Sequence, residues 1–460
     1  MKKLFWIPLL LLSLPAAGAQ DLRLKVPYTT FTLANGLTVI LHVDRSTPRV
    51  AVNTWFLVGS GNEKPGRTGF AHLFEHLMFM GSKNVPTGKF DEWLEAAGAD
   101  NNGSTTPDRT NYYEDLPGNA LELALFLDSD RMGYLVEAMS PKAVDAQRDV
   151  VKNERRQSYE NRPYGMASLV IDENLYPAAH PYHWPTIGSM ADLSAASYED
   201  VVEFFRTYYA PNNAVLSIAG DIDPDRTKTL VEKWFGEIPR GKPVPLIDAP
   251  PAHLSAEKRL AFEDRVQLPR LYMSWLSPAQ FKPGDAELDI LANLLSGGKN
   301  ARLYRRLVYE MQIAQDVSAY QESQAQISSF QIVATARSGH GLAELEKVIQ
   351  EELDRIKKEA PGRREVERAV NQYEASFINR LERIGGFMGK ANALNSYYAA
   401  TGNPDYFQED LARYKNIDPE DITAFTRSFL RDDGRVVLSV VPKGKKELAA
   451  AGTFISVEGK

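Results

Sequence analysis

The chain has no cysteine, and only seven of its 460 residues are histidine. Without cysteine it forms no disulfide and no thiolate metal site, and the lipid-anchored export route of bacteria is closed. Low-complexity tracts are also absent. The formal net charge of −7 argues against nucleic acid or an anionic membrane as the main partner. These absences leave a globular chain that folds without covalent cross-links.

Only one stretch, at the start of the chain, resembles a targeting segment. Two lysines precede an apolar run from Leu4 to Leu14, and residues 17–19 have the A-x-A pattern of a cleavage site. An uncleaved membrane anchor is the alternative, but the run is too short to span a bilayer and Pro15 interrupts it. We expect residues 1–19 to be a signal peptide and the protein to be exported to a bacterial periplasm, with no membrane span after cleavage.

Two distant segments have similar sequences. Residues 198–221 and 419–442 each read as an amphipathic helix followed by a β-branched strand. This similarity predicts an internal duplication, and 460 residues suit two domains of roughly 200 each. A segment with five prolines, residues 236–257, separates the copies and has the composition of a semi-rigid linker.

The expected fold class is α+β. Strand-like runs open each half and helical patterns follow, without a strict strand–helix alternation. We therefore expect two similar halves, each a largely antiparallel sheet packed with helices. The predicted divisions are a signal peptide (1–19), an N-terminal domain (20–240), a linker (241–257), a C-terminal domain (258–446) and a tail (447–460).

Two of the scarce histidines lie in one apolar stretch. The sequence predicts a helix over residues 69–80, with Thr68 as its cap and Gly81 at its end. His72 and His76 are four residues apart and share a helix face, so both imidazoles can bind one Zn²⁺ ion. Glu75 lies beside them and is not needed as a ligand, so it can take a proton from water.

Two imidazoles do not hold zinc firmly, so a third ligand is needed. The best source is a second predicted helix, which Ser140 caps and Pro141 begins and which runs to about residue 161. Glu154 lies toward its apolar face. Periodicity alone, however, would read Glu154 as a solvated carboxylate.

The motif His72-x-x-Glu75-His76, followed after 77 further residues by Glu154 in "DVVKNE", resembles the pitrilysin/insulinase metallopeptidases, the inverzincins. The resemblance covers essentially the whole chain after the signal peptide and is close to the two-domain bacterial and mitochondrial-processing-peptidase branch. It implies one Zn²⁺ per chain, held by the two histidines and Glu154, with Glu75 as general base.

The resemblance also implies a peptide substrate and where it binds. Residues 101–113 would contribute an active-site strand, in which Asn102, Gly103 and Ser104 pair with an extended peptide. Without the family, these residues read as a turn. Gln147 stands where many members have a glutamate, and it would support the third ligand by hydrogen bonding.

The sequence departs from the family at two positions in the second half. Active single-chain members carry an arginine and, seven residues later, a tyrosine, which hold the substrate and stabilise the tetrahedral intermediate. Here the matching residues are Val308 and Gln315. Three explanations compete. Gln315 or one of the nearby tyrosines, Tyr309 and Tyr320, takes over the role of the missing pair, or the enzyme is weak. Alternatively, a zinc-free paralogue supplies the arginine and the tyrosine across a heterodimer interface. We favour the third explanation.

The sequence as a whole predicts a periplasmic zinc endopeptidase that cleaves peptides or unfolded segments. The alternative is a weakly active or non-catalytic subunit that needs a paralogous partner. Two other histidines three residues apart, in "HPYHWP" (180–185), have flanking prolines and read as loop residues rather than metal ligands.

Overall fold

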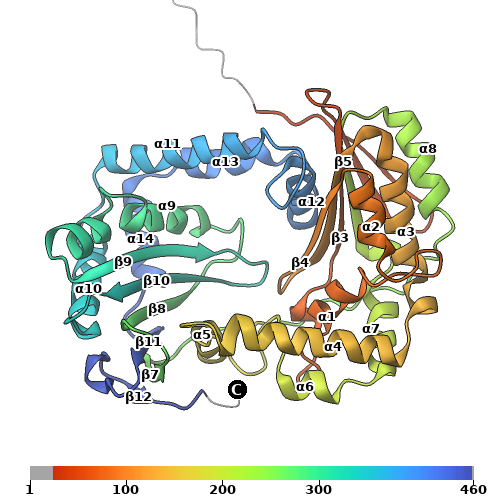
Figure 1. Ribbon diagram of the computed structural model, residues 1–460. Helices are drawn as coiled ribbons and strands as arrows, with labels where there is room; N and C mark the ends of the chain where they lie inside the picture. The colour runs from red at the N-terminus through yellow and green to blue at the C-terminus, as the bar shows by residue number, and fades with distance from the viewer. Residues whose placement is uncertain (1–23, 458–460) are drawn as a thin grey trace, which may run out of the picture.

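Each half of the chain is built on a six-stranded sheet (Figure 1). The computed structural model describes residues 24–457, so the predicted signal peptide lies outside the described residues. The first sheet has the order β1-β2-β6-β3-β5-β4, and the second has the order β12-β7-β11-β8-β10-β9. Each sheet is packed with helices, which confirms the predicted α+β class.

The first half contains strands β1 (Thr29–Thr32), β2 (Thr38–Val43), β3 (Arg49–Phe56), β4 (Asp100–Thr105), β5 (Thr110–Pro117) and β6 (Ala214–Gly220). Its helices are α1 (Phe70–Leu77), α2 (Lys89–Ala96), α3 (Leu121–Ala138), α4 (Pro141–Arg155), α5 (Ala167–Leu175), α6 (Met190–Ala195), α7 (Tyr198–Tyr208) and α8 (Pro224–Phe235). A short π-helix, η3 (Arg156–Glu160), continues α4.

The second half contains strands β7 (Lys258–Asp264), β8 (Arg270–Ser277), β9 (Ala314–Glu322), β10 (Ser328–Ala336), β11 (Arg435–Pro442) and β12 (Thr453–Phe454). Its helices are α9 (Asp285–Ser296), α10 (Leu342–Lys358), α11 (Arg363–Arg380), α12 (Lys390–Thr401), α13 (Phe407–Lys415) and α14 (Pro419–Phe429). A second π-helical turn, η5 (Tyr304–Glu310), precedes β9.

The two similar sequence segments occupy equivalent places in the two sheets. They form α7–β6 in the first half and α14–β11 in the second. Strand β6 lies between β2, to which it is parallel, and β3, to which it is antiparallel, and β11 lies in the same way between β7 and β8. The described strands otherwise pair antiparallel, except β12 with β7. The predicted similarity of the halves is confirmed.

The halves exchange helices. In the view of Figure 1, α4 and α5 run along the bottom from the first half toward the second, and α11 runs along the top toward α12, which lies beside the first sheet. Val170 and Ile171 of α5 are buried in one cluster with Tyr272 and Leu438 of the second sheet. In return, Leu394 of α12 lies in a cluster with residues of the first sheet.

Polar contacts fix α12 on the first sheet. Asn395 is completely buried; its Nδ2 donates to the carbonyl oxygen of Asn53 at 2.8 Å, and its Oδ1 accepts from Ser217 Oγ at 2.6 Å. The side-chain oxygen of Asn392 accepts from Trp55 Nε1 at 2.8 Å. Since buried polar groups cost free energy when unpaired, these contacts set where α12 sits as well as holding it there.

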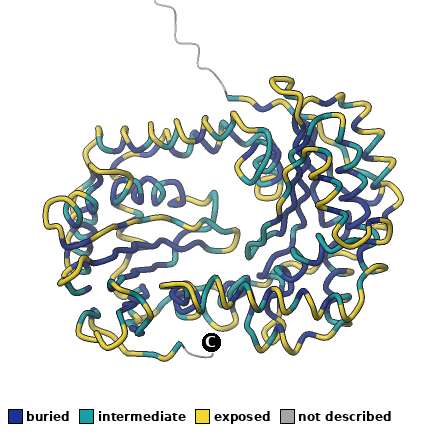
Figure 2. Tube along the Cα trace, viewed as in Figure 1, coloured by how far each residue is buried: buried dark blue, intermediate teal, exposed yellow. Residues whose placement is uncertain are grey.

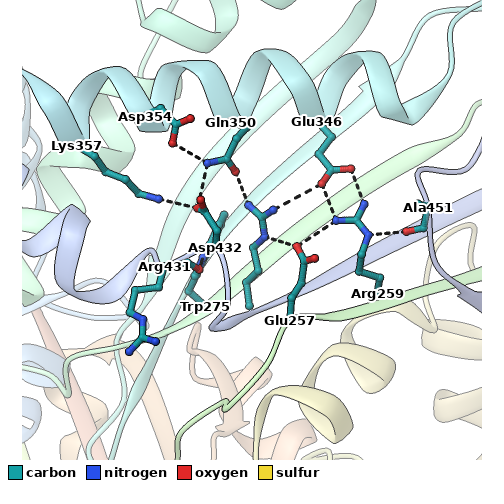
Figure 3. Close-up of polar contacts among 11 residues, drawn as sticks. Glu257, Arg259, Trp275, Glu346, Gln350, Asp354, Lys357, Arg431, Asp432 and Ala451 are labelled. Atoms are coloured by element: carbon teal, nitrogen blue, oxygen red, sulfur yellow. Dashed lines mark hydrogen bonds and ion pairs between the residues drawn. The ribbon is translucent and has the colours of Figure 1, made fainter.

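Residues 236–257 contain no helix or strand. Their far end is fixed by a network of charges that joins the second sheet to α10 (Figure 3). Arg259 forms two bonds to Glu346, at 2.8 and 2.7 Å, and Arg435 Nε donates to Glu257 at 2.7 Å. Bidentate pairs of this kind define orientation as well as contact.

Buried residues line the strands of both sheets, and exposed residues lie mostly on the outer helices and loops (Figure 2). Within residues 24–457, every helix is too short or too polar to cross a lipid bilayer.

Replacing Asn395 with alanine should destabilise the fold, because it removes two buried hydrogen bonds, one from the amide to the Asn53 carbonyl and one to the amide from the Ser217 hydroxyl. We expect the free energy of unfolding to fall by about 2 kcal/mol or more. Asn379→Ala in α11 is the matched control, since that residue is exposed and gains the same helix propensity. Urea unfolding of both variants measures the difference, and an equal effect of the two would contradict the role given to α12.

Candidate metal centre and active site

Helix α1 begins at the buried side chain of Glu63, which the sequence pattern did not predict to lie there. Gly69 precedes the helix with φ of 91°, a conformation that favours glycine. Glu63 accepts hydrogen bonds from the backbone N–H groups of Gly69 (2.9 Å) and Ala71 (2.8 Å). The two oxygens of the Glu63 carboxyl group satisfy donors that have no partner within the helix.

The predicted caps of this helix are wrong. Thr68 does not cap α1: its hydroxyl donates to Asp192 Oδ2 at 2.6 Å and so ties the loop to α6. Gly81 lies beyond the helix, which ends at Leu77 rather than at residue 80. The reason is that Glu63, from six residues before Gly69, supplies the acceptor that was expected from Thr68.

The structure brings together the three predicted metal ligands. One ligand atom from each of His72, His76 and Glu154 lies within 4.8 Å of the other two. Glu154 Oε2 is 3.1 Å from His76 Nε2 and 3.7 Å from His72 Nε2. The two imidazole rings are 4.8 Å apart and nearly perpendicular, as expected for residues four apart on one helix.

Helix α4 delivers Glu154. Its start is as predicted: the Ser140 side chain accepts from the Ala143 N–H, and Pro141 occupies the first turn. Val144 and Val151 are completely buried in the core of the first half, which fixes the face that α4 turns toward α1. Glu154 is placed three residues after Val151, near the edge of that face.

The electrostatics of the cluster suit a divalent cation. Burial lowers the pKa of His72 to about 4, so its imidazole is neutral at neutral pH. The hydrogen bond from His76 lowers the pKa of Glu154, which stays ionised. Two neutral imidazoles and one carboxylate are a ligand set of catalytic zinc sites. The residues present therefore fit a zinc ion, and His72 Nδ1 remains a buried nitrogen without a hydrogen bond.

Glu75 lies between the histidine helix and the edge of the first sheet. Its Oε2 accepts a hydrogen bond from Thr105 Oγ at 2.6 Å, which orients the carboxylate. Burial raises the pKa of Glu75. A half-buried carboxylate with a raised pKa beside a metal-ligand cluster is suited to take up and return a proton.

The predicted substrate residues lie on β4, the last strand of the first sheet, so one of its edges faces no other strand. Asn102 is exposed, and its Oδ1 accepts from the Gly103 N–H at 2.8 Å. Gly103 packs on α1: a Cβ atom there would lie 3.1 Å from Glu75 Cγ and 3.2 Å from Phe79. Ser104 turns to the other face and donates to Asn111 Oδ1 at 2.7 Å.

Gln147 is buried on α4, and its Nε2 donates to the sulfur of Met80. This contact ties α4 to the segment after α1, so Gln147 braces the two helices that carry the ligands. Support of the third ligand by Gln147 stays a prediction.

Residues at the family's arginine and tyrosine positions make no contact with the cluster in the described part of the chain. Val308 packs on the core of the second half, and Gln315 is exposed on β9. Tyr309 is 76% exposed. The Tyr320 hydroxyl donates to Gln331 at 3.3 Å. None of these is joined by a hydrogen bond or ion pair to His72, Glu75, His76 or Glu154.

Two family models match the chain on either side of α6. Residues 38–180, which include the ligand cluster, match the model described as insulinase (peptidase family M16), and residues 195–373 match the peptidase M16 inactive domain. The chain belongs to the insulinase family. This finding confirms the resemblance that the His72-x-x-Glu75-His76 motif indicated.

Relatives in this family are similar over nearly the whole chain. The zinc protease PqqE of Helicobacter pylori is 29% identical over 394 residues, which are 85% of this chain and 88% of that protein. A crystal structure of a protease from Helicobacter pylori has a TM-score of 0.85 at 26% identity and covers 91% of this chain and 100% of that one. The periplasmic protease PqqL of Escherichia coli shares the fold, with a TM-score of 0.75 at 19% identity, and this comparison covers 93% of this chain and 49% of that one.

Three residues near the cluster could not be found from sequence patterns. Glu63 has no helical spacing to α1, and Thr105 and Arg109 belong to a hairpin that packs beside it. The available signal was weak: Thr105 and Arg109 lie within residues 101–113, the segment that the family resemblance marked as an active-site strand, but nothing in the sequence singled them out.

The stability of the protein should depend on pH through Glu63. Burial raises the pKa of Glu63 to about 8 from its ordinary value of 4.5. The unfolded chain therefore loses this proton first as the pH rises, and stability should fall between these two values by up to about 1.4 kcal/mol per pH unit.

Urea unfolding of the wild type and of Glu63→Gln across this range measures the effect. The amide of glutamine can still accept a hydrogen bond but does not titrate, so the variant should show the shallower pH dependence. Parallel curves for the two proteins would contradict this account of Glu63.

Proposed function

We propose that the protein is a zinc-dependent endopeptidase that cleaves peptides or unfolded segments. One observation carries the proposal: His72, His76 and Glu154 offer ligand atoms within 4.8 Å of one another, with the Glu75 carboxylate beside them. Zinc is the metal implied by the family, and we propose one ion per chain.

Bound zinc would lower the pKa of a water molecule and polarise the scissile carbonyl group. Glu75 takes the proton from the attacking water and then gives it to the leaving amine. Thr105 holds the Glu75 carboxylate in one orientation through its hydroxyl. The raised pKa of Glu75 makes its carboxylate a stronger base toward the attacking water.

The open edge of β4 is the proposed binding place for the peptide. An extended peptide would add a strand there, with backbone hydrogen bonds that do not depend on its sequence. Gly103 keeps the strand close to Glu75, because a side chain at this position would collide with that residue and Phe79. Asn102 and Ser104 flank this point of close approach.

We further propose that the protein is exported to a periplasm, on the basis of the leader-like residues 1–19. The predicted peptidase domain (20–240), linker (241–257), peptidase-like domain (258–446) and tail (447–460) are part of the same proposal. The lack of secondary structure over residues 236–257 supports the linker.

A second candidate function has its own support. Val308 and Gln315 cannot do the work of the family's arginine and tyrosine, and neither Tyr309 nor Tyr320 contacts the cluster. The chain can therefore be the zinc-bearing subunit of a heterodimer, whose zinc-free paralogue supplies the missing pair. Alone it would be weakly active or inactive.

Replacing Glu75 with glutamine should leave the metal in place and slow peptide cleavage by about a hundredfold or more, because the amide cannot act as a base. His76→Ala should lose both metal and activity, and Glu95→Gln, at an exposed position, should lose neither. Zinc content by mass spectrometry and cleavage of a quenched peptide give the two readouts. If Glu75→Gln cleaves at the wild-type rate, the assignment of the base is wrong.

Addition of a zinc-free paralogue that carries the arginine–tyrosine pair should raise the rate of cleavage by about 10²–10³, the usual value of a missing stabilising donor. The effect should disappear when that arginine and tyrosine are both replaced in the paralogue. A wild-type chain that is fully active alone would rule out the heterodimer requirement and leave the endopeptidase proposal intact.

A further inference from the structure

Arg109 lies at the tip of the hairpin formed by β4 and β5, beside the proposed peptide-binding edge. Its Nη1 donates to the Ser104 carbonyl oxygen at 2.7 Å and to Asn111 Oδ1 at 2.9 Å. The guanidinium lies over the ring of Trp55, 5.3 Å from its centroid. These three contacts hold the side chain in one position on the face of the sheet opposite α1.

The second half of the molecule fixes this position further. Asn392 of α12 accepts hydrogen bonds from Trp55 Nε1 at 2.8 Å and from Asn111 Nδ2 at 3.1 Å. Two of the three groups that hold Arg109, Trp55 and Asn111, are thus themselves held by the second half. A side chain this firmly supported is prepared for a ligand rather than free to move to one.

Glu75 and Asp108 attract Arg109 only from beyond hydrogen-bonding distance, and this attraction does not offset the effect of burial on its pKa. Among the residues that the structure describes, no aspartate or glutamate forms an ion pair with Arg109, although burial is strong enough to lower the pKa of its guanidinium to about 10. The adjacent Asp108 is already committed, since it accepts from the Tyr182 hydroxyl and, at 3.0 Å, from the Ala325 N–H. A largely buried charge without a partner is costly unless a ligand supplies the opposite charge.

The guanidinium faces a large cavity between the two halves. This cavity has a volume of about 1160 Å³ and is lined by Trp55, Thr105 and Arg109 from the first half, by the linker and by the β9–β10 turn. Thr105, which orients Glu75, and Arg109 therefore line the same space. Three other charged residues line it: Asp108 next to Arg109, Arg240 before the linker and Glu322 from β9.

We propose that Arg109 is a specificity-determining residue that binds a carboxylate of the peptide substrate. The proposal rests on the endopeptidase function and on peptide binding at β4. Side chains of a strand alternate between faces, so a peptide paired with β4 would turn every second side chain toward Ser104 and Arg109. The substrate residue that carries this carboxylate would thus lie within about two residues of the scissile peptide bond, which is placed beside Glu75.

The carboxylate can come from an aspartate or glutamate side chain or from the C-terminus of the peptide. The guanidinium fork binds either one, with Nε and Nη2 still free of hydrogen bonds to the described residues. A site built to pair with a charged group discriminates strongly against an analogue that lacks the charge, because its own polar groups are then left unpaired.

Two pairs of peptides test the proposal and separate the two sources. One pair differs by glutamate or glutamine near the cleaved bond, and the other by a free or an amidated C-terminus. Binding is measured by fluorescence anisotropy with the full-length Glu75→Gln protein, and cleavage is measured with otherwise wild-type protein. We expect at least one acid to bind about tenfold more tightly than its neutral twin and to show a similar advantage in kcat/KM.

Arg109→Gln should reduce this advantage to within about twofold, and Arg109→Lys should retain part of it, because lysine keeps the charge but not the fork. Arg45→Gln, at a residue with a 67% exposed side chain on the first half, is the matched control and should keep the full advantage. Circular dichroism confirms that each variant is folded. Arg240→Gln tests whether any positive charge in the cavity has the same effect.

The outcomes distinguish this inference from the proposed function. If the wild type binds and cleaves the carboxylate-bearing and the neutral peptide of each pair equally well, Arg109 has no role in specificity. That result would contradict the role of Arg109 and leave the endopeptidase proposal intact. An equal loss for both twins in Arg109→Gln would make the residue a structural support of the hairpin and would also overturn it. If the zinc-loaded wild type cleaves nothing, yet binds the acid in a manner that depends on Arg109, the endopeptidase function falls and the carboxylate site stands.

Discussion

The approach of Glu154 to the two imidazoles is the interaction on which the site depends. It joins residues 78 positions apart, and nothing local in either helix would produce it. Helix α1 has only eight residues, too few to be stable alone, so its position comes from the Glu63 carboxylate at its start and from the burial of Leu73, Phe74 and Leu77. The same packing sets the distance between Glu75 and the edge of the sheet.

The duplicated half shows what the same framework becomes without imidazoles. Helix α9 follows β8 as α1 follows β3, and it carries Asp285 and Asp289 four residues apart, the spacing of His72 and His76. Here the protein supplies the partners: Arg413 Nη2 donates to Asp285 at 2.6 Å, and the Tyr414 hydroxyl donates to Asp289 at 2.7 Å. In the first half, His72 and His76 approach Glu154 closely enough for the three to share a cation. In the second half, the carboxylates of α9 are bound by hydrogen-bond donors of the protein itself.

The sequence allowed the fold class and the three candidate metal ligands to be predicted, but not the details that depend on contacts through space. His72 and His76 were visible as a pair because helical spacing places them on one face. Glu154 needed the family resemblance, since its own periodicity is that of a solvated residue, and Gly103 needed it because Asn-Gly reads as a turn. Arg109 was missed because its interest lies in its burial without an ion pair among residues 24–457, which no local pattern can reveal.

The exchange of α5 and α12 between the halves bears on how such a chain could arise. If each half once existed as a separate chain, its own sheet would have lacked the helix that now covers it, and two copies would have swapped that helix to bury both sheets. Joining the copies end to end, through a proline-rich segment, would then have turned an obligate pair into one molecule. Each half could afterwards change its sequence independently, so that one could lose its ligands while continuing to complete the core of the other.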